Sequence, residues 1–256
     1  MPGTTSAFTE IARSRRSPRQ FLPTTLSPSD IYGVLEDAQT APSNSNTQPW
    51  SVHVVSGAAR DALAKELLLA EEDGRTSPDF TDGYGDGLYL ERSRALGASV
   101  YRARGVERSD RDGRRAAVRE NLEFYGAPHA AFLFMPALGD GVRAAGDTGM
   151  YAQNFLLSLA PGGLAGIPQT VLGVYADTVR EFLGVPAELK LLSLRSCTSK
   201  RVMVSSRGSL GQGNGLAPWM TCHPEAGVPV KRCWTPSPRS VTKAVRPVSS
   251  SATRCP

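Results

Sequence analysis

Three short stretches of this 256-residue chain carry polar side chains whose spacing could bind a ligand. The first contains Arg15, Arg16, Ser17 and Arg19, just past the end of a predicted helix. Guanidinium groups donate charge-assisted, bidentate hydrogen bonds to phosphate, and the neighbouring hydroxyl adds another donor. The segment therefore predicts a phosphate site, although a solvated basic turn would have the same composition.

The second stretch is the loop at residues 42–49, PSNSNTQP, which precedes a β-branched run. Its short neutral donors and acceptors are held between two prolines, so they could recognise the polar edge of a heterocycle or a ribityl chain. An ordinary capped loop is the alternative. The candidate binding residues here are Pro42, Ser43, Asn44 and Asn46.

The third stretch is an apolar helix that carries Gln153, followed by a glycine-rich turn at residues 163–166 and then by Pro168 and Gln169. Glycines let a backbone approach a flat ligand closely. A core helix followed by a loop is the simpler interpretation of the same residues.

The elements that must position these stretches are predicted from hydrophobic spacing and from end signals. Ser27 can cap a helix with Pro28 at its first position, and that helix ends before Pro42. Other helices are predicted over 8–17, 58–72, 88–104, 111–124, 147–159 and 179–183, and strands over 50–55, 130–135 and 189–194. Because helices and strands interleave without strict alternation, we expect the α+β class.

Composition limits the partners. The net charge of +5 comes from the end of the chain: up to Lys190 there are 19 basic and 23 acidic residues, and beyond it 10 basic residues and one acid. The mildly acidic body gives no reason to expect nucleic acid as a partner. No apolar run is long enough for a membrane span or a signal core, so we expect a cytoplasmic protein and no membrane partner. The four cysteines lack the paired short spacing of a zinc site, so we expect no metal.

Together, and in this order, the three stretches resemble the nitroreductase family. Its pattern is an R-x-S-x-R/K segment, a P-S-x-x-N-x-Q-P-W loop entering a strand, and a Q-N-x-L-L helix leading to a G-x-x-P-Q-like turn. Residues 179–186 also match its V-R-x-x-L-G-I-P stretch, and the resemblance covers residues 6–194. It implies a nitroreductase-like domain over 1–194, with a central mixed, mainly antiparallel sheet flanked by helices.

The resemblance also implies a homodimer that holds FMN at the subunit interface. NADH or NADPH would donate electrons, and a nitroaromatic, quinone or similar small molecule would accept them, in a ping-pong cycle. No catalytic side chain is required, because FMN carries the hydride chemistry. A helical insertion at residues 75–115 would shape the acceptor pocket.

Residue by residue, the resemblance assigns the two ends of the flavin. Arg15 and Ser17 would bind the phosphate with Arg16 beside them, and Arg19 would lie near the pyrimidine edge, where a positive charge favours reduced flavin. Pro42, Ser43, Asn44 and Asn46 would come from the partner subunit. The residues expected to face or contact the ring system are Gln153, Pro168, Gln169 and, as a further contact, Asn121.

Residues 195–256 do not continue the family pattern. The family typically goes on with G-x-x-x-G-Y-x-D and then N-x-x-R-x-x-R, whereas this chain becomes rich in Ser, Arg and Pro. Such a segment buries too little apolar surface to offset its ordering entropy. We therefore expect a disordered tail, or one produced by an out-of-frame reading of the gene. The alternative to an active reductase is a flavin-binding or degenerate homologue with little turnover.

Overall fold

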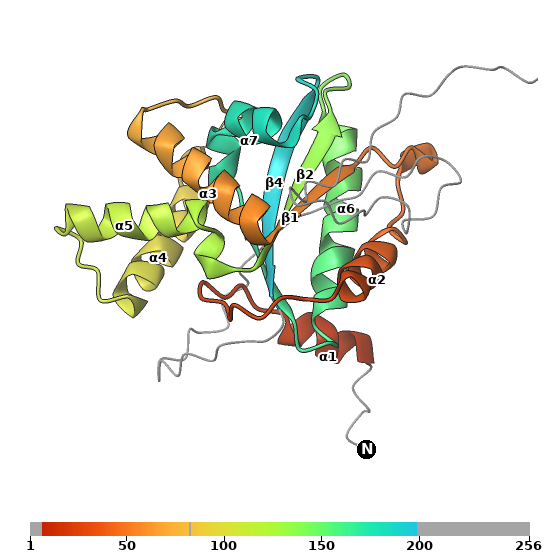
Figure 1. The fold of residues 1–256 in the computed structure, drawn as a ribbon, viewed down its shortest axis with the longest axis horizontal. Coiled ribbons are helices and arrows are strands. Elements are labelled where there is room, and N and C mark those ends of the chain that lie inside the picture. Colours follow the sequence, from red (N-terminus) through yellow and green to blue (C-terminus); the bar gives the residue numbers. More distant parts are fainter. Residues whose placement is uncertain (1–6, 82, 199–256) are drawn as a thin grey trace, which may run out of the picture.

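A four-stranded sheet forms the centre of the computed structural model, which describes residues 7–81 and 83–198 (Figure 1). Its strand order is β1-β2-β4-β3, and each neighbouring pair is antiparallel. The strands are β1 (Ser51–Ser56), β2 (His129–Pro136), β3 (Ala165–Gln169) and β4 (Leu189–Thr198). The sheet and its flanking helices confirm the predicted α+β class.

Helices cover both faces of the sheet (Figure 1). One face packs against α3 (Gly57–Glu72), α5 (Arg111–Leu122) and α7 (Ala176–Leu183), and the other against α2 (Pro28–Ala38) and α6 (Val142–Leu159). No helix in the described part of the chain is long and apolar enough to span a membrane. The remaining elements are α1 (Ala7–Ser14), α4 (Leu88–Ala103), η1 (Asn44–Asn46), η2 (Phe124–Gly126) and η3 (Val171–Val174).

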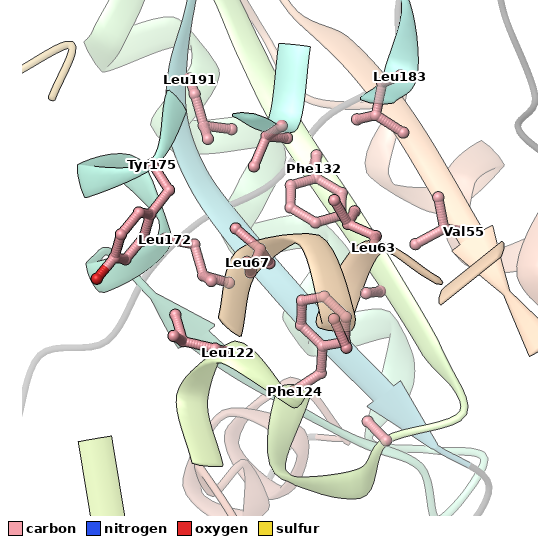
Figure 2. Packing of buried hydrophobic residues seen from close by; sticks show 14 of the residues in the cluster. Val55, Leu63, Leu67, Leu122, Phe124, Phe132, Leu172, Tyr175, Leu183 and Leu191 are labelled. Atoms are coloured by element: carbon pink, nitrogen blue, oxygen red, sulfur yellow. The ribbon is translucent and has the colours of Figure 1, made fainter. Parts of the chain in front are cut away.

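β2 supplies side chains to two separate cores. Phe132 packs with Leu63 and Phe124 on the face covered by α3 (Figure 2). Leu133 belongs to the opposite core, where the rings of Trp50 and Tyr151 lie 5.1 Å apart. Because successive strand residues point to opposite faces, an uninterrupted apolar run is what a strand between two helical layers requires.

The start of α2 follows its local sequence. The Ser27 hydroxyl accepts a hydrogen bond from the Asp30 amide at 3.1 Å, and the Asp30 carboxylate accepts one from the Ser27 amide at 3.0 Å. This is a reciprocal capping box, with Pro28 at the first helical position. The predicted N-cap is confirmed.

Three sequence-based boundaries were wrong. The segment expected as a glycine-rich turn contains β3, an edge strand that pairs only with β4. Pro168 has no backbone N–H to donate to a neighbouring strand, so a strand that contains it is confined to the edge of a sheet. The same proline makes the strand hard to predict from the sequence. Helix α6 begins at Val142 rather than Asp147, and β4 continues past the expected boundary at Leu194 to Thr198. Of the tail predicted over 195–256, residues 195–198 belong to β4, and residues 199–256 lie outside the described residues.

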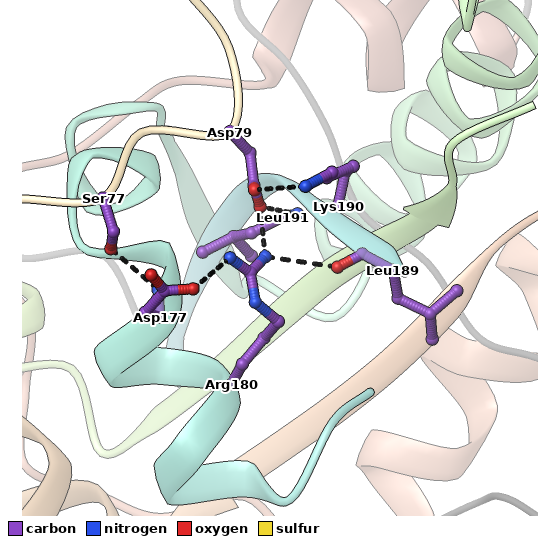
Figure 3. Close-up of polar contacts among 7 residues, drawn as sticks. All are labelled: Ser77, Asp79, Asp177, Arg180, Leu189, Lys190 and Leu191. Carbon is purple, nitrogen blue, oxygen red and sulfur yellow. Dashed lines mark hydrogen bonds and ion pairs between the residues drawn. The ribbon is translucent and has the colours of Figure 1, made fainter. Parts of the chain in front are cut away.

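The start of the insertion is held by a buried ion-pair network (Figure 3). The carboxylate of Asp79, with its side chain 3% exposed, accepts hydrogen bonds from Arg180, from Lys190 at 3.2 Å and from the Leu191 amide at 2.8 Å. Arg180 also pairs with Asp177 at 2.6 Å. Burial raises the pKa of Asp79, but these hydrogen bonds and the charge of Arg180 outweigh it and leave the pKa below its ordinary value.

We expect Asp79→Asn to lower the free energy of unfolding by about 3 kcal/mol, because removing one partner of a buried ion pair leaves the other charge poorly compensated. Urea denaturation monitored by circular dichroism measures this change. Asp73→Asn is the matched control, because its pair with Arg75 is solvent-exposed and should contribute little. Equal losses in the two variants would contradict the importance of this network.

A buried histidine joins the segment before α2 to the sheet. The Leu26 amide donates to Nε2 of His129 at 2.7 Å, so Nδ1 carries the proton and donates to the Ser56 hydroxyl at 2.6 Å. Burial lowers the pKa of His129 to about 4. Its neutral form therefore belongs to the folded state.

This depressed pKa has a consequence for stability. Between pH 6.5 and pH 4, His129 is protonated in the unfolded chain but neutral in the folded protein. The free energy of unfolding should therefore fall as pH is lowered through this range, by up to about 3 kcal/mol. Chemical denaturation at a series of pH values measures the slope. His129→Gln should flatten it in this window, and an unchanged slope would show that other groups cause it.

Candidate functional site

The arginine segment follows the end of α1 directly. Arg15 is half-buried and donates through Nη1 to the Ser17 hydroxyl at 3.1 Å. Arg16 is exposed and donates to the carbonyl groups of Arg15, at 2.9 Å, and of Arg13. Burial, and then the charge of Arg16, lower the pKa of Arg15. The protein thus concentrates positive charge beside a hydroxyl group.

The segment lacks internal neutralisation. No carboxylate among residues 7–81 and 83–198 forms an ion pair with Arg15, Arg16 or Arg19. Half-buried cations without a counter-ion favour binding of an external anion, and the planar guanidinium groups suit a phosphate. No three His, Cys, Asp or Glu side chains of these same ranges converge as metal ligands.

The polar loop between α2 and β1 is exposed but conformationally fixed. The Ser43 hydroxyl accepts from the Gln48 amide at 2.9 Å, and the Asn44 amide donates to the Asp147 carboxylate of α6 at 3.0 Å. Ser45, Asn46 and Gln48 have φ angles of 51°, 54° and 47°. Left-handed conformations cost free energy in residues other than glycine, and they tend to occur where function requires a particular shape.

A series of side-chain amides supports that loop. Trp50 Nε1 donates to Gln39 Oε1 at 3.2 Å, and Gln39 Nε2 donates to Gln48 Oε1 at 3.1 Å. Gln48 Nε2 then donates to Asn46 Oδ1 at 2.8 Å. Sequence reasoning missed Gln39, Gln48 and Asp147 as supports of the site. Of these three, only Gln48 lies within the motif, in its Gln-Pro-Trp ending.

A second cluster gathers predicted residues from distant segments. The buried Gln169 of β3 donates through Nε2 to the Asn121 backbone carbonyl at 3.1 Å and to its Oδ1 at 3.2 Å. The Tyr125 hydroxyl donates to the same Oδ1 at 2.7 Å. Asn121 and Gln169 are therefore in contact, and Pro168 directly precedes Gln169 in β3. Gln153 on α6 and Pro168 are both half-buried.

Two arginines complete this cluster. Arg104, at the end of α4, donates to the Arg19 carbonyl at 3.4 Å, stacks 5.5 Å from the Tyr125 ring centroid and pairs with Glu120. Burial raises the pKa of Tyr125, while the charges of Arg19 and Arg104 and a hydrogen bond from Arg19 act to lower it. Arg19 is thus close enough to Tyr125 to act on its pKa, and Tyr125 in turn contacts Asn121. Sequence reasoning did not find Tyr125 or Arg104.

One chain keeps the two groups of predicted residues apart. In Figure 1 the segment that joins α2 to β1 lies at the upper right, whereas the segment that follows α1 runs along the lower side of the sheet. The segment between α2 and β1 is therefore separated from the segment that follows α1 within the same chain (Figure 1).

This fold and these motifs define a known class of protein. A sequence model of the Nitroreductase family matches residues 12–195, so the chain belongs to the nitroreductase family. Nitroreductase NfnB of Mycolicibacterium smegmatis is 43% identical over 190 residues, which are 73% of this chain and 81% of that protein. A 4-nitrobenzoate reductase of Pseudomonas putida is 33% identical over 182 residues, which are 70% of this chain and 79% of that reductase.

A solved structure has the same fold. The crystal structure of the FMN-dependent nitroreductase NfnB from Mycobacterium smegmatis in complex with NADPH has a TM-score of 0.71 and 43% sequence identity to this chain. The likeness covers 75% of this chain and 86% of that one.

The amide series predicts how a conservative change would act on the loop. In Gln39→Glu the side chain can still accept from Trp50 but can no longer donate to Gln48. We expect amide hydrogen exchange in residues 42–49 to accelerate by up to about tenfold, the effect of losing one hydrogen bond, while β1 stays protected.

Asp37→Asn is the matched control for this exchange experiment. Asp37 accepts a hydrogen bond from Ser158, so it joins α2 to α6 as the loop does, but without contacting the loop. If both variants accelerate exchange equally, or if neither does, the amide series does not hold the loop.

Proposed function

We propose that this protein is an FMN-dependent oxidoreductase that passes electrons from NADPH or NADH to a nitroaromatic, quinone or similar small acceptor, in a ping-pong cycle. Family membership supports the proposal, as does the 43% identity to an FMN-dependent nitroreductase solved with NADPH. The observation that carries it is the group Arg15, Arg16 and Arg19, which lacks carboxylate partners among the described residues although acids outnumber bases in the chain up to Lys190.

The described residues fit both ends of FMN. Arg15, Arg16 and Ser17 offer guanidinium and hydroxyl donors to its phosphate. For the other end, the contact between Asn121 and Gln169 and the charge of Arg19 near Tyr125 support a proposed site for the polar edge of the flavin. The bound flavin supplies the hydride chemistry, and the cation favours the negative charge that reduction adds.

The remaining contacts come, in this proposal, from a second copy of the chain. Pro42, Ser43, Asn44 and Asn46 belong to the segment between α2 and β1, which is separated from the arginine segment within one chain, so they can reach the same flavin only from a partner subunit (Figure 1). Gln153 and Pro168 would complete the lining of the ring system. The rigid conformation of the loop supports this assignment, because a preformed loop loses less entropy when it binds.

Helix α4, in the insertion at residues 75–115, is proposed to shape the acceptor pocket. None of its residues is buried, and Leu88, Tyr89 and Leu96 are 55%, 67% and 56% exposed. Exposed apolar side chains on one helix favour contact with a partner or an apolar substrate. In the proposed homodimer, this helix would contact the partner subunit and would also present apolar side chains to an acceptor at the flavin site.

The test begins with the purified full-length chain. We expect the absorption spectrum of stoichiometric FMN, and NADPH oxidation that depends on added 4-nitrobenzoate. Arg15→Ala should raise the dissociation constant of FMN by about ten- to a hundredfold, because it removes a hydrogen bond to a charged group. Flavin release measured by fluorescence during dilution provides this constant.

Arg13→Ala is the matched control, because Arg13 is an exposed arginine in the last turn of α1, just before the arginine segment. It should leave the dissociation constant within about twofold of the original value, as a screened surface charge would. Equal weakening in both variants would mean that FMN is attracted only by net charge. A colourless protein that binds no added FMN would overturn the proposed function, and flavin binding without turnover would instead indicate the degenerate homologue.

A further inference from the structure

The side-chain amide of Asn121 is fully engaged by groups of the protein. Its Nδ2 donates to the backbone carbonyls of Ala117 and Val118 at 3.3 and 3.0 Å. Its Oδ1 accepts from the Tyr125 hydroxyl at 2.7 Å and from Gln169 Nε2 at 3.2 Å. Because an amide offers two hydrogens and two lone pairs, these four contacts use its whole hydrogen-bonding capacity.

Backbone carbonyls determine which way both side-chain amides point. A carbonyl oxygen can only accept, so the Asn121 atom that faces Ala117 and Val118 is its nitrogen. Gln169 contacts the backbone carbonyl of Asn121 at 3.1 Å, so the Gln169 atom in that contact is also its nitrogen. Asn121 thus presents two acceptors, its backbone carbonyl and its Oδ1, to the nitrogen of Gln169. Together they fix the direction of the Gln169 amide.

These contacts join the end of an edge strand to a helix. Gln169 is the last residue of β3, pairs with Leu194 of β4 and is 4% exposed. Asn121 lies one residue before the end of α5, where Leu122 is buried in the core. A buried polar group that loses its partner costs about 1–3 kcal/mol. Gln169 therefore keeps its orientation as long as Asn121 accepts from it.

We propose that Asn121 is a positioning residue of the flavin site: it fixes the direction of the Gln169 side chain and does not itself bind the flavin. This inference rests on the proposed function, in which Gln169 contacts the flavin. A direct flavin contact by Asn121, as the family resemblance implies, is one alternative. A purely structural role in joining α5 to β3 is the other.

A double-mutant cycle on the full-length, FMN-loaded protein separates these roles. The dissociation constant of FMN is measured for Asn121→Ala, Gln169→Ala and the double variant. Asn121→Ala removes one of the two acceptors that hold Gln169, so we expect the constant to rise by about three- to tenfold, the effect of losing one hydrogen bond. The double variant should bind FMN no more weakly than Gln169→Ala alone, because the two residues act as a unit.

The midpoint potential of bound FMN is a second readout, which a loss of stability alone would not shift. Asn121→Ala should shift it in the same direction as Gln169→Ala, and the double variant should shift it no further than Gln169→Ala. Asn154→Ala is the matched control, because Asn154 donates a side-chain hydrogen bond to Thr40, just after α2, at 3.3 Å. It should leave both quantities at their original values. Asn121→Ser repeats the cycle if Asn121→Ala does not fold.

Three results would overturn the positioning role. Single effects that multiply in the double variant would show that Asn121 contacts the flavin separately. An Asn121→Ala variant that behaves like Asn154→Ala would show a purely structural role, and a Gln169→Ala variant with unchanged FMN binding would leave nothing for Asn121 to position. In each case an original protein that binds FMN and oxidises NADPH leaves the proposed function intact. An original protein that binds no FMN overturns both.

Discussion

The rest of the structure depends on the burial of β2 between two layers of helices. Seven of its eight residues are buried, and it pairs with β1 on one side and β4 on the other. Three parts of the candidate site are attached to the sheet that this strand organises. The polar loop leads into β1, the Tyr125 turn leads into β2, and Gln169 ends β3, which pairs with β4. Packing of the two cores therefore sets the distances between segments that are remote in sequence.

Backbone strain is confined to the segments that the site uses. Among residues 7–81 and 83–198, all the non-glycine residues with positive φ lie in two places: Ser45, Asn46 and Gln48 in the loop, and Phe124 and Tyr125 before β2. Each such residue costs on the order of 1–3 kcal/mol, so it persists only where its surroundings determine it. Side-chain amides maintain the first group, and the Asn121 and Arg104 contacts maintain the second. The strained conformations cost folding free energy, but they fix polar side chains of the candidate site before any ligand binds.

Local signals predicted the parts of the fold that local interactions determine. Ser27, Pro28 and Asp30 are consecutive or nearly so, and the helix cap that they form could be predicted from the sequence. The strand at Pro168 could not, because only its pairing with β4 makes an Ala-Gly-Ile-Pro-Gln segment extended.

The candidate site divides in the same way. The residues proposed to bind a ligand were predicted from motifs, but the residues that contact and support them were not. Asp79 meets Arg180, and Gln169 meets Asn121, across 101 and 48 positions of sequence. Nothing in the local composition around Tyr125 indicates that Arg19 lies close enough to act on its pKa. Such partners are brought together by tertiary packing, which a single sequence does not display.

The electrostatics of the chain explain why its arginines divide into two groups. Arg104, Arg119 and Arg180 pair with carboxylates, and the body of the protein has acids in excess. The lack of such pairs around Arg15 and Arg16 is therefore not a shortage of acids. Burial, and then the charge of Arg16, lower the pKa of Arg15, so the charged form of Arg15 is disfavoured in the protein alone. A bound phosphate would stabilise that charged form, so ligand binding and the stability of this segment must be thermodynamically linked.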